Sequence, residues 1–198
     1  MNLNKIKICT LFLLLSILFT FGCTNPFHPE ATENVDNGDF YPFDNPKNVL
    51  LNLQLSYQQQ NLELYEKCLS DSFRFELISS DVSQFGVDMN GDGINDSWWG
   101  YQQEISYHRN LFIDGSSDGN LKTPDQISLN LQIPPEESWQ IDNQEGHEGW
   151  IIIPCHFDLQ LFLTNASNIL SNGYALFYLK EEAGEWKIAV WRDESNVN

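Results

Sequence analysis

Basic residues are scarce in this chain. Ten Lys and Arg stand against 28 Asp and Glu among 198 residues, for a net charge of −18 at neutral pH. A field of that sign repels phosphate groups, which excludes nucleic-acid-binding proteins. No internal repeat is present either. Aromatic residues are plentiful, with 6 Trp, 7 Tyr and 13 Phe, so the chain has enough apolar volume for a packed core and is not a disordered polyanion.

The apolar run at the N-terminus is too short to span a membrane. Ile8–Phe21 has about 14 residues where a membrane helix needs roughly 20, and it follows the basic segment Met1–Lys7. This pattern is typical of a signal peptide, predicted here as residues 1–22. The segment ends in Thr20-Phe21-Gly22-Cys23, which resembles a bacterial lipobox. The resemblance implies that Cys23 is acylated and anchors the chain to a membrane of the bacterial cell envelope, facing the exported side; ordinary secretion with a free Cys23 is the alternative.

Removal of the signal peptide changes the charge and the cysteine count. Residues 1–22 contain two Lys and no acid, so the mature chain has eight basic and 28 acidic residues, a net charge of −20. Cys68 and Cys155 then remain besides Cys23. Both lie in apolar patterns, which predicts buried free thiols, with a disulfide as the alternative. Residues 23–42 are polar and aperiodic and are predicted to be a flexible tether, followed by a domain at 43–193 and a tail at 194–198.

Helices are predicted at the start of the domain. Asn45 suits a helix cap and Pro46 the first helical position. Apolar residues recur at helical spacing through Gln60, and again in a short second helix at 62–69. From Phe73 the period changes to two, which predicts a strand. A third helix is predicted at 97–112, with an apolar stripe formed by Tyr101, Ile105, His108 and Phe112.

The second half of the domain alternates like a sheet. Strands are predicted at 126–133, 151–163, 174–180 and 185–191, and the last two are joined by a hairpin turn at 181–184. In the longest strand the odd-numbered residues are apolar, so His156 and Asp158 are expected on the opposite, polar face. Helices followed by antiparallel strands predict an α+β fold with helices covering one face of the sheet.

Four segments in this order, 46–57, 61–73, 99–112 and 184–193, resemble the nuclear transport factor 2-like domain, also called cystatin-like or SnoaL-like. The resemblance implies a cone in which a curved antiparallel sheet packs against N-terminal helices, and a homodimer formed through the sheet. Isomerases, dehydratases, partner-binding modules and lipoproteins share this fold, so the fold does not define the activity.

A possible metal site lies between the first strand and the third helix. Asp88, Asn90, Asp92 and Asp96, with the Ile94 carbonyl, match the first ligands of an EF-hand loop, which predicts weak Ca²⁺ binding in the range of about 10⁻⁴–10⁻³ M. Position 12 of the loop is Trp99, where a bidentate Glu belongs; Glu104 could replace it only if the loop folded back. The alternative is a turn rich in Gly, Asn and Asp that binds no ion.

Candidates for catalysis are few. His108 on the third helix could act as a general base, although a hydrogen-bonded core histidine is the simpler interpretation. No paired Asp is found at the inward positions of the strands, which argues against an enzyme. His156 and Asp158 could hold a metal only with a third ligand such as His147. Trp98 and Trp99 could form an aromatic platform for a glycan or peptide, with at least one of them expected in the core.

These observations favour a membrane-anchored lipoprotein that binds a ligand or serves a structural role without catalysis. The alternative is a small-molecule isomerase or hydrolase of the SnoaL-like type that uses His108 as its base. Ca²⁺ is the only cofactor that the sequence suggests.

Overall fold

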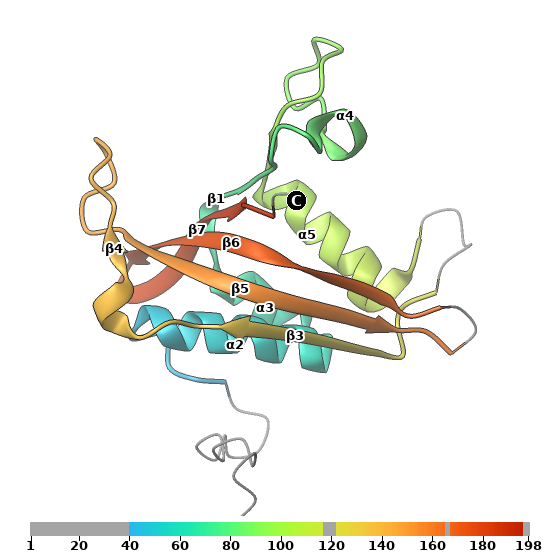
Figure 1. The fold of residues 1–198 in the computed structure, drawn as a ribbon, viewed down its shortest axis with the longest axis horizontal. Helices are drawn as coiled ribbons and strands as arrows, with labels where there is room; N and C mark the ends of the chain where they lie inside the picture. Colours follow the sequence, from blue (N-terminus) through green and yellow to red (C-terminus); the bar gives the residue numbers. More distant parts are fainter. Residues whose placement is uncertain (1–39, 117–121, 165–166, 196–198) are drawn as a thin grey trace, which may run out of the picture. The chain divides into compact units, whose positions relative to one another are not determined.

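The computed structural model describes residues 40–116, 122–164 and 167–195 (Figure 1). The predicted signal peptide, Cys23 and most of the predicted tether lie outside these ranges. Among the described residues, no helix is both long enough and apolar enough to cross a membrane.

The two N-terminal helices begin as the sequence predicts, and each ends one residue before its predicted end. The helix α2 spans Pro46–Gln59, and the Asn45 side chain caps it by accepting a hydrogen bond from the Asn48 N–H at 2.9 Å. Gln60 takes a left-handed conformation that ends the helix. Asn61 then caps α3 (Leu62–Cys68) in the same way as Asn45 caps α2.

The first strand starts earlier than predicted. β1 spans Leu69–Glu76, so Ser70 and Asp71 belong to the strand and the prediction of a start at Phe73 is wrong. The reason is tertiary, because Leu69 is buried and pairs in parallel with Ile188 of the last strand. The single-turn helix α4 (Val82–Phe85), which was not predicted, lies in the segment that projects from the sheet after β1 (Figure 1).

The predicted helix at 97–112 is correct only from Tyr101. Trp98–Gly100 form the strand β2, which pairs antiparallel with β1, and the extended backbone of Gly100 keeps the helix from starting earlier. The helix α5 spans Tyr101–Arg109 and continues as a π-helical turn, η1, over Asn110–Asp114. Single π-helical turns are frequent at functional sites.

Five strands follow, one more than predicted, and the additional one is the two-residue strand β4. They are β3 (Gln126–Gln132), β4 (Gln140–Ile141), β5 (Ile151–Phe162), β6 (Ile169–Glu182) and β7 (Glu185–Asp193), with a short 3₁₀ helix η2 (Glu136–Ser138) before β4. β6 starts five residues before the predicted Tyr174, because residues 169–173 pair with β5. The predicted hairpin turn is confirmed: Ala183 and Gly184 both have positive φ, as a two-residue turn between twisted strands requires.

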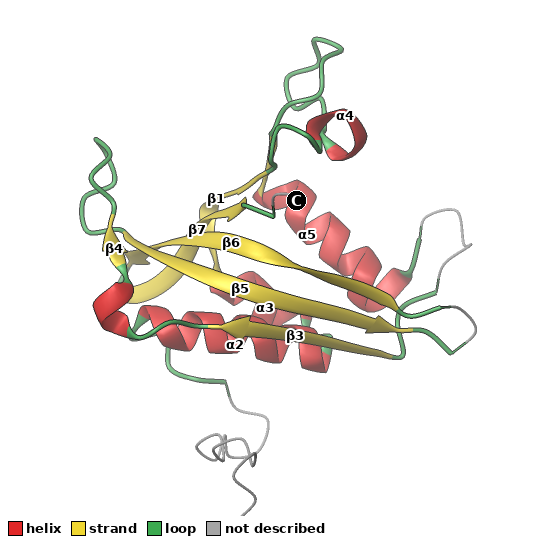
Figure 2. Cartoon of the chain, in the orientation of Figure 1, coloured by secondary structure: helices red, strands yellow, loops and turns green. Residues whose placement is uncertain are grey.

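The sheet has the order β2-β1-β7-β6-β5-β3, with β4 paired to β5 (Figure 2). All neighbours are antiparallel except β1 and β7, so the predicted all-antiparallel sheet is corrected by one parallel pair. The predicted α+β class, with helices against a curved sheet, is confirmed.

The core lies between the helices and the inner face of the sheet. Leu50 and Leu53 of α2 are buried in one cluster with Ile153, Phe177 and other inward residues of the strands. The odd-numbered residues of β5 face this core, as predicted. Cys68 and Cys155 are buried free thiols, and burial raises the pKa of Cys155 to about 12.

Candidate functional site

A buried carboxylate on α5 organises the polar interior. Glu104 is 2% exposed. Its side chain accepts a hydrogen bond from the Tyr65 hydroxyl of α3 and another from the Trp99 indole N–H of β2, the latter at 2.5 Å. One helical residue thus joins three elements through hydrogen bonds to a single carboxylate.

His108, one turn further along α5, completes the cluster. Its Nδ1 lies 3.1 Å from the Glu104 carbonyl, and its Nε2 lies 2.6 Å from the Tyr57 hydroxyl of α2. A carbonyl can only accept, so Nδ1 carries the hydrogen, and in the neutral ring Nε2 then accepts from Tyr57. Nδ1 also lies 3.3 Å from the Glu104 carboxylate. The histidine has the bonding of a core residue.

The surroundings of this cluster disfavour the charged forms of His108, Tyr57 and Tyr65. Burial lowers the pKa of His108, and nearby Glu104 opposes this shift only in part. Burial raises the pKa of Tyr57 and of Tyr65 well above the usual value for tyrosine, and the electrostatic effect of Glu104 is the second cause. The Tyr65 ring stacks on the His108 ring with centroids 3.8 Å apart. We call Tyr57, Tyr65, Trp99, Glu104 and His108 the Glu104 cluster.

Sequence reasoning missed the carboxylate in this cluster. The search for an inward acid covered the strands, whereas Glu104 projects inward from a helix. A signal was available: Glu104 lies three residues after Tyr101 and four before His108, so it falls on the same face of the helix. The inward positions of the strands carry no paired Asp, as the sequence analysis found, but the buried carboxylate comes from a helix instead.

A cavity of about 240 Å³ lies between the end of α5 and the sheet. Its described lining is mainly apolar, with Leu111 from η1, Pro124 before β3, Leu161 and Leu163 at the end of β5, and Ile169 at the start of β6. Lys122 is the one charged residue among the described residues that line it. Members of the Glu104 cluster do not line this cavity.

The predicted calcium loop is exposed and is held together by its own side chains. The Asp88 carboxylate accepts hydrogen bonds from the N–H groups of Gly91, Asp92 and Gly93 at 2.6–3.1 Å. These bonds, that of Gly93 foremost, lower the pKa of Asp88. Across the described ranges, no three His, Cys, Asp or Glu side chains lie together so that they could hold a metal ion. Ca²⁺ binding therefore depends on amide and carbonyl oxygens as well and stays a prediction.

The two residues considered for position 12 of the calcium loop belong to the Glu104 cluster. Trp99 stacks on Phe75 with centroids 4.4 Å apart, but Trp98 and Trp99 are both half-buried and neither belongs to the core cluster, so the expectation that at least one of them is a core residue is wrong. Glu104 accepts hydrogen bonds from Tyr65 and Trp99. Trp98 pairs with Glu76 across the strands and lies on the opposite face of the sheet from Trp99.

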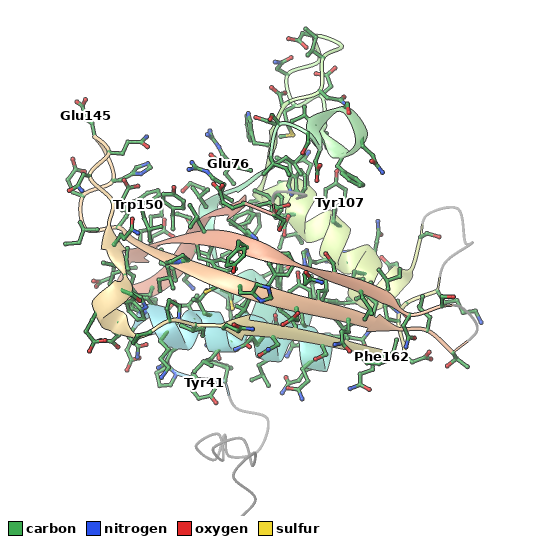
Figure 3. All side chains as sticks on the ribbon, viewed as in Figure 1. Tyr41, Glu76, Tyr107, Glu145, Trp150 and Phe162 are labelled. Carbon is green, nitrogen blue, oxygen red and sulfur yellow. The ribbon has the colours of Figure 1, made fainter. Side chains whose placement is uncertain are left out.

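His156 and Asp158 lie on the outer face of the sheet, as predicted. The His156 Nδ1 and an Asp158 carboxylate oxygen are 3.8 Å apart. His147 was considered as a third ligand. Its Nδ1 is instead hydrogen-bonded to an Asp142 carboxylate oxygen at 2.6 Å, and its ring stacks on Trp150. It belongs to the loop between β4 and β5 that carries Glu145 (Figure 3).

No protein-family model and no curated protein matches this chain. Solved structures are similar in fold. A candidate aromatic ring hydroxylase from Novosphingobium aromaticivorans aligns with a TM-score of 0.52 and 10% identity over 77% of this chain and 87% of its own. A candidate scytalone dehydratase from the same organism aligns with a TM-score of 0.51 and 7% identity over 76% of this chain and 81% of its own. A protein from Kribbella flavida aligns with a TM-score of 0.51 and 10% identity over 75% of this chain and 86% of its own. At such identities the likeness shows the fold alone, the α+β cone of nuclear transport factor 2-like domains.

Burial of neutral His108 makes stability depend on pH. The pKa of His108 is lowered in the folded state, so the unfolded chain binds the proton more tightly, and stability falls as the pH drops below the unfolded pKa of about 6.5. Between pH 7.5 and 5.5 we expect a loss of up to about 1.4 kcal/mol in the free energy of unfolding, measured by urea titration. His108→Gln should flatten this part of the curve, and the matched control His156→Gln should not. An equal slope in the wild type and in His108→Gln would contradict the prediction.

Proposed function

We propose that this chain is a lipid-anchored binding protein of the bacterial cell envelope, without enzymatic turnover, whose cone takes up a small, uncharged, apolar molecule. The observation that carries the proposal is the apolar cavity between η1 and the ends of β5 and β6. Ligand sites are concave and mostly apolar, with few polar groups to fix orientation.

The size and lining of the cavity limit the ligand. An apolar cavity of about 150 Å³ already holds benzene in a well-studied engineered case. About 240 Å³ thus accommodates one aromatic ring or a short acyl segment. The strongly acidic chain repels anions at long range, and the lining residues described contain no acid that could pair with a cation; Lys122 is their one charged group.

The polar groups of the interior support binding rather than catalysis. The general-base candidate His108 is 8% exposed, and both of its ring nitrogens are bonded within the protein. Glu104 accepts from two donors. A catalytic base needs to reach a substrate proton, and these groups reach one another.

An isomerase or hydrolase of the SnoaL-like type is the second candidate, and one observation favours it. The Glu104 carboxylate lies 3.3 Å from His108 Nδ1, so an acid–base pair is present after all. In this function Tyr57 would release Nε2, which would then take a proton from the substrate while Glu104 stabilised the charged ring.

Filling the cavity should abolish ligand binding. Toluene, titrated against chain with ¹³C-labelled methyl groups, should shift the NMR signals of Leu161, Leu163 and Ile169. Ile169→Trp places a large ring in the cavity and should weaken toluene binding by about tenfold or more. Leu170→Trp is the matched control, because Leu170 is the next residue of β6, is 69% exposed and does not line the cavity.

Two outcomes of this experiment would contradict the proposal. Equal affinity in Ile169→Trp and in the wild type would show that the cavity is not the site. Chemical conversion of substrates in a panel of small cyclic ketones and esters, lost in His108→Gln at unchanged stability, would establish the second candidate instead.

Cys23 lies outside the described residues, so the proposed lipid anchor rests on the sequence. Its support is the lipobox-like sequence and the short apolar run before it. Two or three acyl chains on one residue hold a protein stably at a membrane, since each buried methylene contributes about 0.8 kcal/mol.

Acylation of Cys23 has a direct test. In a bacterial host, mass spectrometry of the mature chain should show a diacylglyceryl group on an N-terminal Cys23, and the protein should sediment with membranes. Cys23→Ser should move it to the soluble fraction, whereas Cys68→Ser, a change at a buried thiol, should leave it with the membranes. An unmodified Cys23 would contradict the anchor.

Calcium binding at the Asp88–Asp96 loop belongs to the same proposal, with a role in stiffening the loop. If the dissociation constant is about 10⁻⁴–10⁻³ M, 10 mM Ca²⁺ should add about 1.4–2.7 kcal/mol to the free energy of unfolding relative to chelator. Asp92→Asn should remove this increment in thermal or urea melts, and Asp81→Asn, outside the loop, should keep it. Identical melts in Ca²⁺ and chelator would contradict calcium binding.

A further inference from the structure

A polar groove of about 440 Å³ lies where β1 and β7 end and β2 begins. Arg74, Glu76, Trp98 and Arg192 line it, together with the backbone that leaves β1 and enters β2. The strand register places these four side chains on the outer face, because Glu76 pairs with Trp98 on one side and with Arg192 on the other. Figure 3 labels Glu76. The groove is distinct from the apolar cavity of the proposed function and shares no lining residue with it.

The charges of the groove balance closely. Two arginines, Arg74 and Arg192, line it together with three acids, Glu76, Asp193 and Glu194, which leaves a net charge of −1. Glu76 lies between the arginines, 2.6 Å from Arg192 Nε and 3.8 Å from Arg74 Nη1. Neither an anion nor a bare cation gains a clear net attraction from such a lining, whereas a neutral ligand that both donates and accepts hydrogen bonds is served by it.

Arg74 has unused donors. Its side chain is 49% exposed, its nearest carboxylate is Glu76 at 3.8 Å, and its guanidinium makes no hydrogen bond within the described part of the chain. It rests instead over the Trp98 ring, 4.5 Å from the centroid. An exposed contact of this kind is worth only about 0.5–1 kcal/mol, so a ligand can take the place of Arg74 on the ring at small cost.

Arg192 is held in place by its neighbours. Its Nε donates to Glu76 and its Nη1 donates to the Tyr178 hydroxyl at 2.8 Å. This arrangement fixes Glu76, and the carboxylate oxygen that faces Arg74 has no hydrogen bond within the described residues. The groove thus presents a fixed acceptor, an unused fork of donors and an aromatic ring side by side.

The geometry points to a binding site for a neutral saccharide in this groove. The ring of a sugar has an apolar C–H face that packs on an aromatic side chain, and its hydroxyl groups donate and accept at the edge. Trp98 would supply the platform, Arg74 the donors and Glu76 the acceptor. The volume falls in the usual range of small-molecule sites, about 300–1,000 Å³.

The test uses the full chain and three probes: cellobiose, N,N′-diacetylchitobiose and glucuronate. At least one neutral disaccharide should shift the indole N–H signal of Trp98 in ¹⁵N NMR spectra and give a dissociation constant in the millimolar range. Trp98→Ala and Arg74→Met should each weaken this binding by about tenfold. Trp150→Ala is the matched control, because Trp150 also has a cation over its ring, Lys180 at 5.3 Å, but does not line the groove.

Three results would overturn the site. Absence of binding by both disaccharides is one, and binding of glucuronate alone is another, because it would mark an anion site. The third is a loss of binding in Trp150→Ala with none in Arg74→Met. Should Trp98→Ala fail to fold in thermal melts, Arg74→Met decides, since it changes an exposed side chain and keeps its aliphatic stem.

Discussion

A carboxylate taken out of water has to receive hydrogen bonds from the protein, and Glu104 meets this demand with donors from two other elements. Tyr65 comes from α3 and Trp99 from β2. Through His108, on the same helix, the network extends to Tyr57 of α2. This constraint fixes α5 against the N-terminal helices. It also explains why the chain is extended at 98–100: a helix starting at Ser97 would lose the strand that pairs with β1 and carries Trp99 to the carboxylate.

The position of α5 in turn separates three environments. The Glu104 cluster is closed, the apolar cavity lies beyond it at η1, and the charged groove lies across the sheet on the outer face. The few lysine and arginine side chains of this acidic chain share one kind of contact. Five of them lie over aromatic rings, among them Arg74 over Trp98, Arg192 over Tyr178 and Lys180 over Trp150. Cations and aromatic rings are thus combined where the chain meets solvent, which gives the outer face its potential for recognition.

Local rules account for what the sequence predicts well. The Asn45 cap, the alternation of β5 and the turn at Ala183 and Gly184 each depend on neighbours in the chain, and all are confirmed. Tertiary partners decide the rest: β1 starts early because Leu69 meets Ile188, and β6 starts early because β5 lies beside it. Glu104 was missed because an isolated acid on an amphipathic helix resembles a solvated one until its donors, 39 residues before it in one case, are brought to it. The groove depends on the register of three strands, which spacing alone does not give.

Binding and catalysis make different demands on this interior. For His108 to act as a base, the bond between Nε2 and Tyr57 has to break, which leaves a buried hydroxyl unpaired at a cost of roughly 1–3 kcal/mol. A path from the substrate to the ring would have to open as well, because the side chain is largely enclosed by Tyr57, Tyr65 and Phe112. Uptake of an apolar molecule at Leu111, Leu161 and Ile169 breaks none of these contacts. The hydrogen bonds that stabilise the cone therefore favour binding over catalysis, because they occupy both ring nitrogens of His108, the residue otherwise best suited to act as a base.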